Sequence, residues 1–167
     1  MTLRGWALSG VLVACAAHAE ERGFQFRAVA DVGAALRLGA SANSTVYAGP
    51  MAAFDATVGG RLGVMAFHGG AELQGVWLIG ADFPATLRVG PVTGLSVYAA
   101  RWAVLSLDAK LLFPAVGRDF VALGGAFRWG FQLTADGAHL LAASVSAYFA
   151  FGALVTGSVS YVFTLQP

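Results

Sequence analysis

The sequence predicts an all-β fold: an eight-stranded antiparallel up-and-down transmembrane β-barrel, preceded by a cleaved N-terminal signal peptide. Three observations predict it. First, the chain of 167 residues is 57% hydrophobic and only 11% charged, whereas an ordinary soluble domain has about 25% charged residues. Second, apolar and polar residues alternate with period two in eight segments, as they do in β-strands. Third, the charged residues of these segments all fall on one of the two faces.

The first 19 residues are typical of an export signal. MTLRG is a short basic segment, WALSGVLVA is an apolar segment too short to span a bilayer, and AHA at 17–19 fits the small-x-small cleavage rule. We therefore expect residues 1–19 to be a signal peptide and residues 20–167 to form one barrel domain. The only cysteine, Cys15, is either an ordinary residue of the signal or a lipidation site, because LVAC at 12–15 resembles a lipoprotein cleavage box.

The first predicted strand, residues 24–38, shows the alternation most fully. Its eight even-numbered positions are all apolar, and its odd-numbered positions include Arg27, Asp31 and Arg37. Later segments repeat the pattern, each long enough for a tilted transmembrane strand of about 9–11 residues. They are residues 51–64, 70–79, 85–99, 105–113, 121–133, 140–151 and 154–165.

The polar phase of each segment supports its assignment as a strand. In the second to sixth segments it holds charged or amide side chains, in order Asp55, Arg61, Glu72, Gln74, Arg88, Asp108, Lys110 and Arg128. Serine and threonine occupy it in the last two segments. Those two lie in an uncharged stretch from residue 138 that a hydropathy window would assign to a transmembrane helix. A helical membrane bundle is therefore an alternative, although Gly152 and Gly157 interrupt the stretch.

The sequences between the segments have the composition of turns. GASANS, HGG at 68–70, GADFP, PAVGRD and TADG are rich in glycine, proline, asparagine, aspartate and serine. We expect short connections at all of these places except the first, near residues 39–50. Short loops weigh against an adhesin or a phage receptor, because recognition normally lies on long loops.

The distribution of charge predicts which face meets which solvent. A soluble lipocalin-like barrel, the second alternative, would have its charged face outside, whereas an outer-membrane barrel has it inside and its apolar face against lipid. The apolar phase carries no charge, and many polar-phase positions are glycine, alanine or serine, which suits a narrow interior. We therefore predict a network of charges inside the barrel, formed by Arg27, Asp31, Arg37, Asp55, Arg61, Glu72, Arg88, Asp108, Lys110 and Arg128.

This predicted network has two interpretations. Buried charges are tolerable when they are paired and hydrogen-bonded, so the network could fill the interior and fix the strand register. Its six cations exceed its four carboxylates, which would also fit a narrow path for small anions or protons.

Aromatic residues provide a second test of the membrane prediction. With an even number of strands, both termini lie at one end of the barrel. Aromatic side chains then gather near both ends, around a middle of alanine, valine and leucine, as in the two girdles of a membrane barrel. The predicted girdles consist of Phe24, Phe26, Trp77, Trp102, Phe113, Trp129, Phe131, Phe149, Phe151, Tyr161 and Phe163.

The last segment, GSVSYVFTL, alternates Val159, Tyr161 and Phe163. It resembles the C-terminal signal that outer-membrane barrels present to their assembly machinery. Over residues 24–165 the architecture resembles the small eight-stranded outer-membrane barrels, such as the transmembrane domain of outer membrane protein A. The resemblance implies a place in the outer membrane of a Gram-negative bacterium, with outer-membrane lipid and the barrel assembly machinery as partners.

The sequence contains little that indicates catalysis. The net charge of +1 provides no basic patch for nucleic acid. After the signal only His68 and His139 remain, both expected in solvated turns, and no Cys/His cluster has zinc spacing. We therefore predict no enzyme, no cofactor and no metal, and a structural or interaction role. The alternatives are a small transport or pore-forming barrel, and a lipid-modifying enzyme with a serine nucleophile and a histidine base near the lipid-facing rim.

Overall fold

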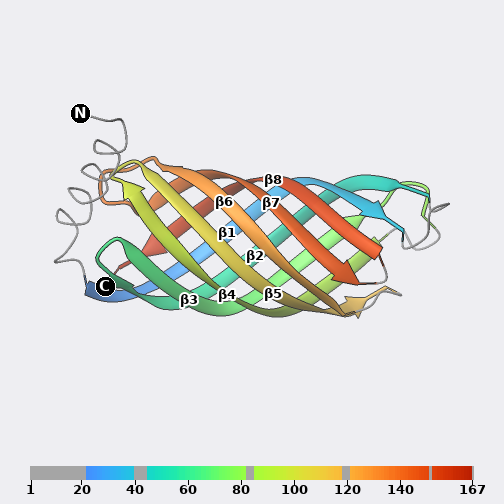
Figure 1. The fold of residues 1–167 in the computed structure, drawn as a ribbon, viewed down its shortest axis with the longest axis horizontal. Coiled ribbons are helices and arrows are strands. Elements are labelled where there is room, and N and C mark those ends of the chain that lie inside the picture. The colour runs from blue at the N-terminus through green and yellow to red at the C-terminus, as the bar shows by residue number, and fades with distance from the viewer. Residues whose placement is uncertain (1–21, 40–44, 82–84, 118–120, 151, 167) are drawn as a thin grey trace, which may run out of the picture.

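The computed structural model describes residues 22–39, 45–81, 85–117, 121–150 and 152–166, which form a closed barrel (Figure 1). Each strand pairs antiparallel with the next, and the last closes on the first. This confirms the predicted all-β, eight-stranded antiparallel barrel. The predicted signal peptide, including Cys15, lies outside the described residues. The strands are β1 (Arg22–Leu38), β2 (Tyr47–Leu62), β3 (Met65–Trp77), β4 (Ala85–Ala100), β5 (Ala103–Val116), β6 (Ala122–Gln132), β7 (His139–Ala150) and β8 (Gly152–Leu165).

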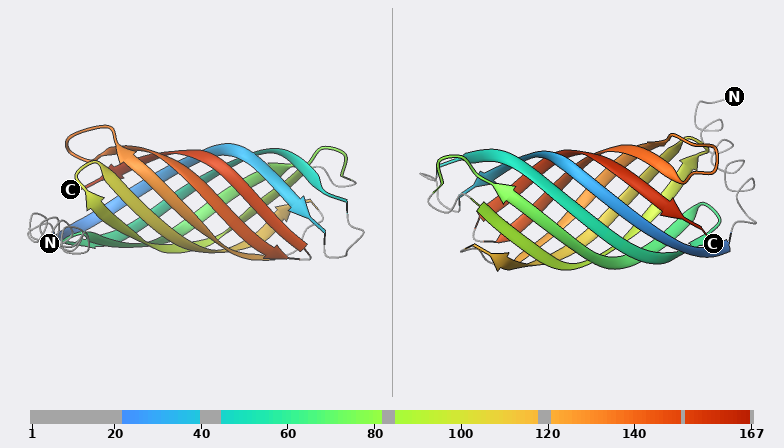
Figure 2. Two further views of the ribbon diagram at one scale, coloured as in Figure 1. Left: turned by 45° about the horizontal axis from the view of Figure 1, so that its top comes forward. Right: turned by 180° about the vertical axis from the view of Figure 1, so that it is seen from behind.

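The barrel is elongated, and its strands run obliquely to the long axis (Figures 1 and 2). We call the end where β1 begins and β8 ends the terminal end. The connections β2–β3, β4–β5 and β6–β7 lie there as well. The opposite end, where β1 runs toward β2 and β3 toward β4, is called the far end.

The stretch from residue 138 forms the hairpin of β7 and β8. The two strands pair in continuous register, with Ser144 opposite Ser158 and Ser146 opposite Thr156. The serine and threonine positions that repeat every second residue therefore share one face of the sheet. A helix in this segment, the first alternative, is wrong. No helix among the described residues is long and apolar enough to cross a membrane.

The predicted turn at HGG is wrong. β2 ends at Leu62 and β3 begins at Met65, so the turn is Gly63–Val64 and residues 68–70 lie inside β3. Gly63 has a φ of 61°, a left-handed conformation that glycine adopts without the usual steric cost. Gly70 is needed for another reason, since a Cβ at this position would collide with the backbone of Ala56 and Thr57 on β2.

The connection predicted near residues 39–50 is shorter than expected. β2 already begins at Tyr47, so residues 47–50 are part of the barrel wall and pair with β1. The reason is register: Tyr47 lies opposite Arg37 and Ala48 opposite Leu36, which extends the β1–β2 hairpin to the far end. Residues 40–44 lie outside the described part of the chain.

The burial of side chains is inverted relative to a soluble protein. Val32, Leu107 and Leu123 project from the outer wall and are 68%, 63% and 62% exposed. Arg128 and Glu72 lie inside and are each 1% exposed. The charged face is therefore the inner face, which is the reverse of what a lipocalin-like barrel requires.

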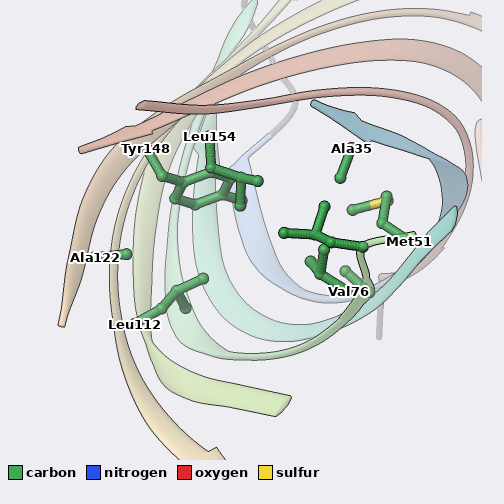
Figure 3. Close-up of a cluster of buried hydrophobic side chains, with 9 residues drawn as sticks. Ala35, Met51, Val76, Leu112, Ala122, Tyr148 and Leu154 are labelled. Atoms are coloured by element: carbon green, nitrogen blue, oxygen red, sulfur yellow. The ribbon is translucent and has the colours of Figure 1, made fainter. Parts of the chain in front are cut away.

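The interior is layered along the barrel axis. β5 shows the order most clearly: Val104 is followed by the inward-facing Ser106, Asp108 and Lys110, and then by Leu112. Near the far end an apolar layer fills the barrel, and Figure 3 shows its side chains projecting inward from different strands. This far-end layer consists of Ala35, Met51, Ala53, Val76, Leu78, Leu112, Ala122, Tyr148 and Leu154. The terminal-end layer consists of Val29, Ala66, Tyr98, Val104, Leu140, Ala142 and Val162.

Candidate functional site

The charged side chains between the two apolar layers, which we call the polar layer, are organised around Arg128 on β6. Its Nη1 donates to Asp108 Oδ2 at 2.8 Å, and its Nη2 donates to Asp31 Oδ2 at 3.2 Å and Asp55 Oδ2 at 3.4 Å. Its Nε donates to Ser160 Oγ at 3.3 Å. One guanidinium thus ties together β1, β2, β5, β6 and β8. The planar fork of arginine suits this role, because its five N–H donors point in fixed directions.

A second cluster lies beside the far-end layer. Lys110 Nζ forms an ion pair with Glu72 Oε2 at 2.5 Å. Gln74 Nε2 donates to the Tyr148 hydroxyl at 2.9 Å, and Gln74 Oε1 accepts from Arg88 Nη1 at 3.0 Å. These side chains come from β3, β4, β5 and β7 and are all buried. They connect the charged centre of the barrel to the apolar layer, to which Tyr148 also belongs.

His68 was expected in a solvated turn, and this prediction is wrong. It lies in β3, and its side chain is only 7% exposed. Its Nε2 lies 2.8 Å from Asp108 Oδ1, and Arg27 Nη1 lies 3.1 Å from the same Nε2 and 3.4 Å from Nδ1. The His68 ring therefore lies between a buried cation and a buried carboxylate.

The polar layer also includes uncharged and histidine side chains outside the predicted charge network. His68, Gln74, Ser96, Ser106 and Ser160 all make hydrogen bonds to the predicted charges or to one another. The sequence does contain a pattern that places His68 inside the barrel. Positions 68, 70, 72 and 74 share one phase of β3, and Glu72 and Gln74 mark this phase as the polar one. Because HGG was assigned to a turn, His68 was not placed on this face.

Two of the ten predicted charges lie outside the buried set. Arg37 and Arg61 are half-buried, near the far end and the terminal end of the strands that carry them. Arg61 Nε donates to the carbonyl of Gly63 at 3.0 Å, and its guanidinium lies 3.9 Å from the centre of the Tyr98 ring. The other eight are buried, four cations and four carboxylates: Arg27, Arg88, Lys110, Arg128, Asp31, Asp55, Glu72 and Asp108. The excess of two cations is therefore at the barrel ends.

His139, expected in a solvated turn, and Asp136, in the predicted turn TADG, have separate partners. His139 begins β7, and its Nδ1 lies 2.5 Å from the Tyr161 hydroxyl of β8. Asp136 Oδ1 accepts from the backbone N–H of Ala138 at 3.0 Å. Hydrogen bonds from Thr134 and from this backbone amide lower the pKa of the Asp136 carboxyl.

The predicted girdle residues that the structure describes lie on the outer wall. Phe163 is half-buried and Phe151 lies outside the described residues, while the others are exposed. Near the terminal end, Trp102 stacks on Phe131 with ring centres 5.6 Å apart, and Trp129 lies 5.2 Å from the same ring. Trp77, Phe113 and Phe149 lie toward the far end of their strands. Their contact with membrane interfaces stays a prediction.

His68 does not support a catalytic site on the lipid-facing rim, because its side chain points into the interior. Among the residues that the structure describes, no group of three or more His, Cys, Asp or Glu side chains could hold a metal ion. No family model matches the chain, and no curated protein matches it. The site must therefore be interpreted from its geometry.

Proposed function

We propose that this chain is an integral outer-membrane β-barrel protein of a Gram-negative bacterium, with a structural or interaction role and without catalysis. The inverted burial supports this proposal more than any other observation. The large apolar side chains of the outer wall are exposed on every strand, and within the described part of the chain charge is confined to the inner face and the ends. Soluble monomers rarely expose continuous apolar surface beyond a few hundred Å², whereas lipid requires such a wall.

The filled interior supports a structural role over a pore. Leu112 and Ala122 in the far-end layer are completely buried, and Arg128 in the polar layer is held by three carboxylates. Breaking one partner out of a buried ion pair costs about 3–5 kcal/mol. An ion passing through the barrel would have to displace these contacts and then cross an apolar layer.

The apolar outer wall also supports lipid and the barrel assembly machinery as the partners of the proposed membrane barrel. Lipid chains cover the outer wall, and the barrel assembly machinery inserts the chain. β8 is the strand that closes the barrel, because it pairs with β1 from Phe26–Leu165 through to Leu38–Ala153. Its outward face presents Val159 and Tyr161, the alternation that the machinery would recognise.

Fractionation and gel mobility test this proposal. The protein is expected in the detergent-solubilised outer-membrane fraction, and unheated SDS samples should migrate differently from boiled ones, because a closed membrane barrel resists SDS until heated. Recovery in the soluble periplasm, or an unshifted band from the inner membrane, would overturn the membrane assignment.

Planar-bilayer recordings test the closed interior separately. The purified barrel should give no steady conductance above that of protein-free detergent. Reproducible single-channel steps would instead favour a small transport or pore-forming barrel. A lipid A species that changes with expression of the protein and returns on His139→Ala would favour the enzyme alternative.

A further inference from the structure

The terminal half of the barrel contains a small cavity of about 20 Å³, room for roughly one water-sized group. It lies inside the terminal-end layer, between Ala66, Tyr98 and Val104, and extends toward Gln132 and Gly137 at the β6–β7 connection. Its polar wall is formed by Gln25, Arg27, His68, Ser96, Ser106 and Thr164.

Arg27 is a buried cation with unused donors beside this cavity. It is 9% exposed, and its contacts are made by Nη1, to His68 and to Ser96 Oγ at 3.2 Å. Within the described residues its Nε and Nη2 have no hydrogen-bond partner, and it forms no ion pair with a carboxylate. The His68 ring lies between Arg27 and the carboxylate of Asp108, with its Nε2 2.8 Å from Asp108 Oδ1. Asp108 itself is already paired with Arg128.

Gln25 supplies a second, independent donor. It is 7% exposed, and its Nε2 is buried without a hydrogen-bond partner in the described structure. A buried amide nitrogen left unpaired costs about 1–3 kcal/mol, so such groups normally have a partner. Gln25 and Arg27 share one phase of β1 and both line the cavity.

The chemistry of this wall favours an acceptor with negative charge. Arginine and an amide –NH₂ only donate hydrogen bonds, and a buried cation is stable when it is paired. We propose that the cavity binds one small inorganic anion, of the size and charge of chloride, between the Arg27 guanidinium and the Gln25 amide. The anion would enter from the terminal end. This site is independent of the membrane assignment, because it depends only on the interior of the folded barrel.

Bromide is a suitable probe for this site, because it replaces chloride and scatters X-rays anomalously. Crystals of the detergent-solubilised protein grown with sodium bromide should show an anomalous peak in the cavity, within hydrogen-bond distance of Arg27 and Gln25 Nε2. In solution, sodium chloride should raise the heat-unfolding midpoint saturably relative to sodium gluconate at equal ionic strength.

Gln25→Leu removes a donor while leaving the cation and the approximate side-chain volume, so it avoids the folding risk of replacing Arg27. We expect it to weaken the apparent halide affinity at least tenfold. Ser144→Ala is the matched control, because it also removes a buried polar atom without a partner and lies outside the cavity lining. It should leave halide affinity unchanged. A cavity that holds only water in bromide, or halide binding undiminished by Gln25→Leu, would overturn the proposal.

Discussion

Gly94 allows the His68–Asp108 hydrogen bond to form. It pairs with His68 on β3 and with Asp108 on β5, so the two side chains meet above its Cα. A Cβ at this position would collide with Asp108 Oδ1, His68 Nε2 and the Leu107 carbonyl. The polar layer therefore requires glycine at position 94, because a side chain there would occupy the space in which His68 and Asp108 meet.

Gly94→Ala should lower the free energy of unfolding by about 1–3 kcal/mol, the usual cost of overpacking a filled interior. Urea titration of the protein in detergent micelles measures it. Gly157→Ala is the matched control, because an added Cβ there meets nothing within 4 Å, and its effect should stay within about 0.5 kcal/mol. Equal effects at the two positions would contradict the geometry.

Arg128 is the residue on which the buried charge balance depends most. Arg128→Met leaves Asp31, Asp55 and Asp108 without their shared cation, so we expect a loss of about 3–5 kcal/mol or more in unfolding free energy. Arg128→Lys keeps the charge but not the planar fork and should fall between Met and the original residue. Unfolding in urea and the yield of heat-resistant barrel measure both variants.

A second substitution separates charge from packing at this site. Asp31 has Arg128 as its hydrogen-bond partner. Asp31→Asn therefore removes one of the three buried negative charges that Arg128→Met leaves without a cation. The double variant should be more stable than Arg128→Met alone. A double variant that is no more stable would mean that lost packing, and not stranded charge, causes the defect.

At the scale of elements, β1 carries opposite environments on its two faces. Ala30 projects outward between Phe54 on β2 and Tyr161 on β8, while its neighbour Asp31 points inward to Arg128. Arginine on the lipid face near the bilayer midplane costs about 2–4 kcal/mol. We expect Ala30→Arg to abolish the heat-shifted band in the outer-membrane fraction.

Asp31→Asn is the control for this element, because it alters the other face one residue away. It should be milder, since Arg128 retains Asp55 and Asp108. The test is the amount of heat-shifted barrel in each variant. A harmless Ala30→Arg beside a damaging Asp31→Asn would reverse the faces and refute the membrane proposal.

The period-two pattern was sufficient to predict the strands and which face carries charge, because both depend on neighbours within one segment. It misplaced the start of the second strand, which lies at Tyr47, and the turn at HGG. Glycine occurs both in turns and where strands approach closely, and Gly70 belongs to the second case. The inner apolar layers were also missed. Met51, Val76 and Leu112 meet only through the register of many strands, which no single segment encodes.

At the scale of the whole molecule, the buried layers together fill the interior of the barrel. The buried cations and carboxylates balance in number, so a narrow interior can hold charge without an open channel. The far-end layer then covers this centre with apolar side chains, and the outer wall is apolar at every level. Closure of β8 on β1 leaves no free sheet edge. We expect such an arrangement to be stable in lipid, as the proposed function requires.

The depth of the tryptophans tests this picture of the whole barrel. Trp77 lies at the far end, and Trp102 and Trp129 lie near the terminal end, so all three should sit at membrane interfaces. Single-tryptophan variants reconstituted in phospholipid vesicles should be quenched strongly by lipids brominated near the headgroup and weakly by lipids brominated at the chain ends. Leu107→Trp, about midway in the chain between the girdle residues Trp102 and Phe113 and 63% exposed on the outer wall, is the control and should show the opposite order. If Trp77 is instead quenched most by lipids brominated at the chain ends, as Trp at position 107 should be, Trp77 lies near the bilayer centre. That result would contradict the prediction of two aromatic girdles.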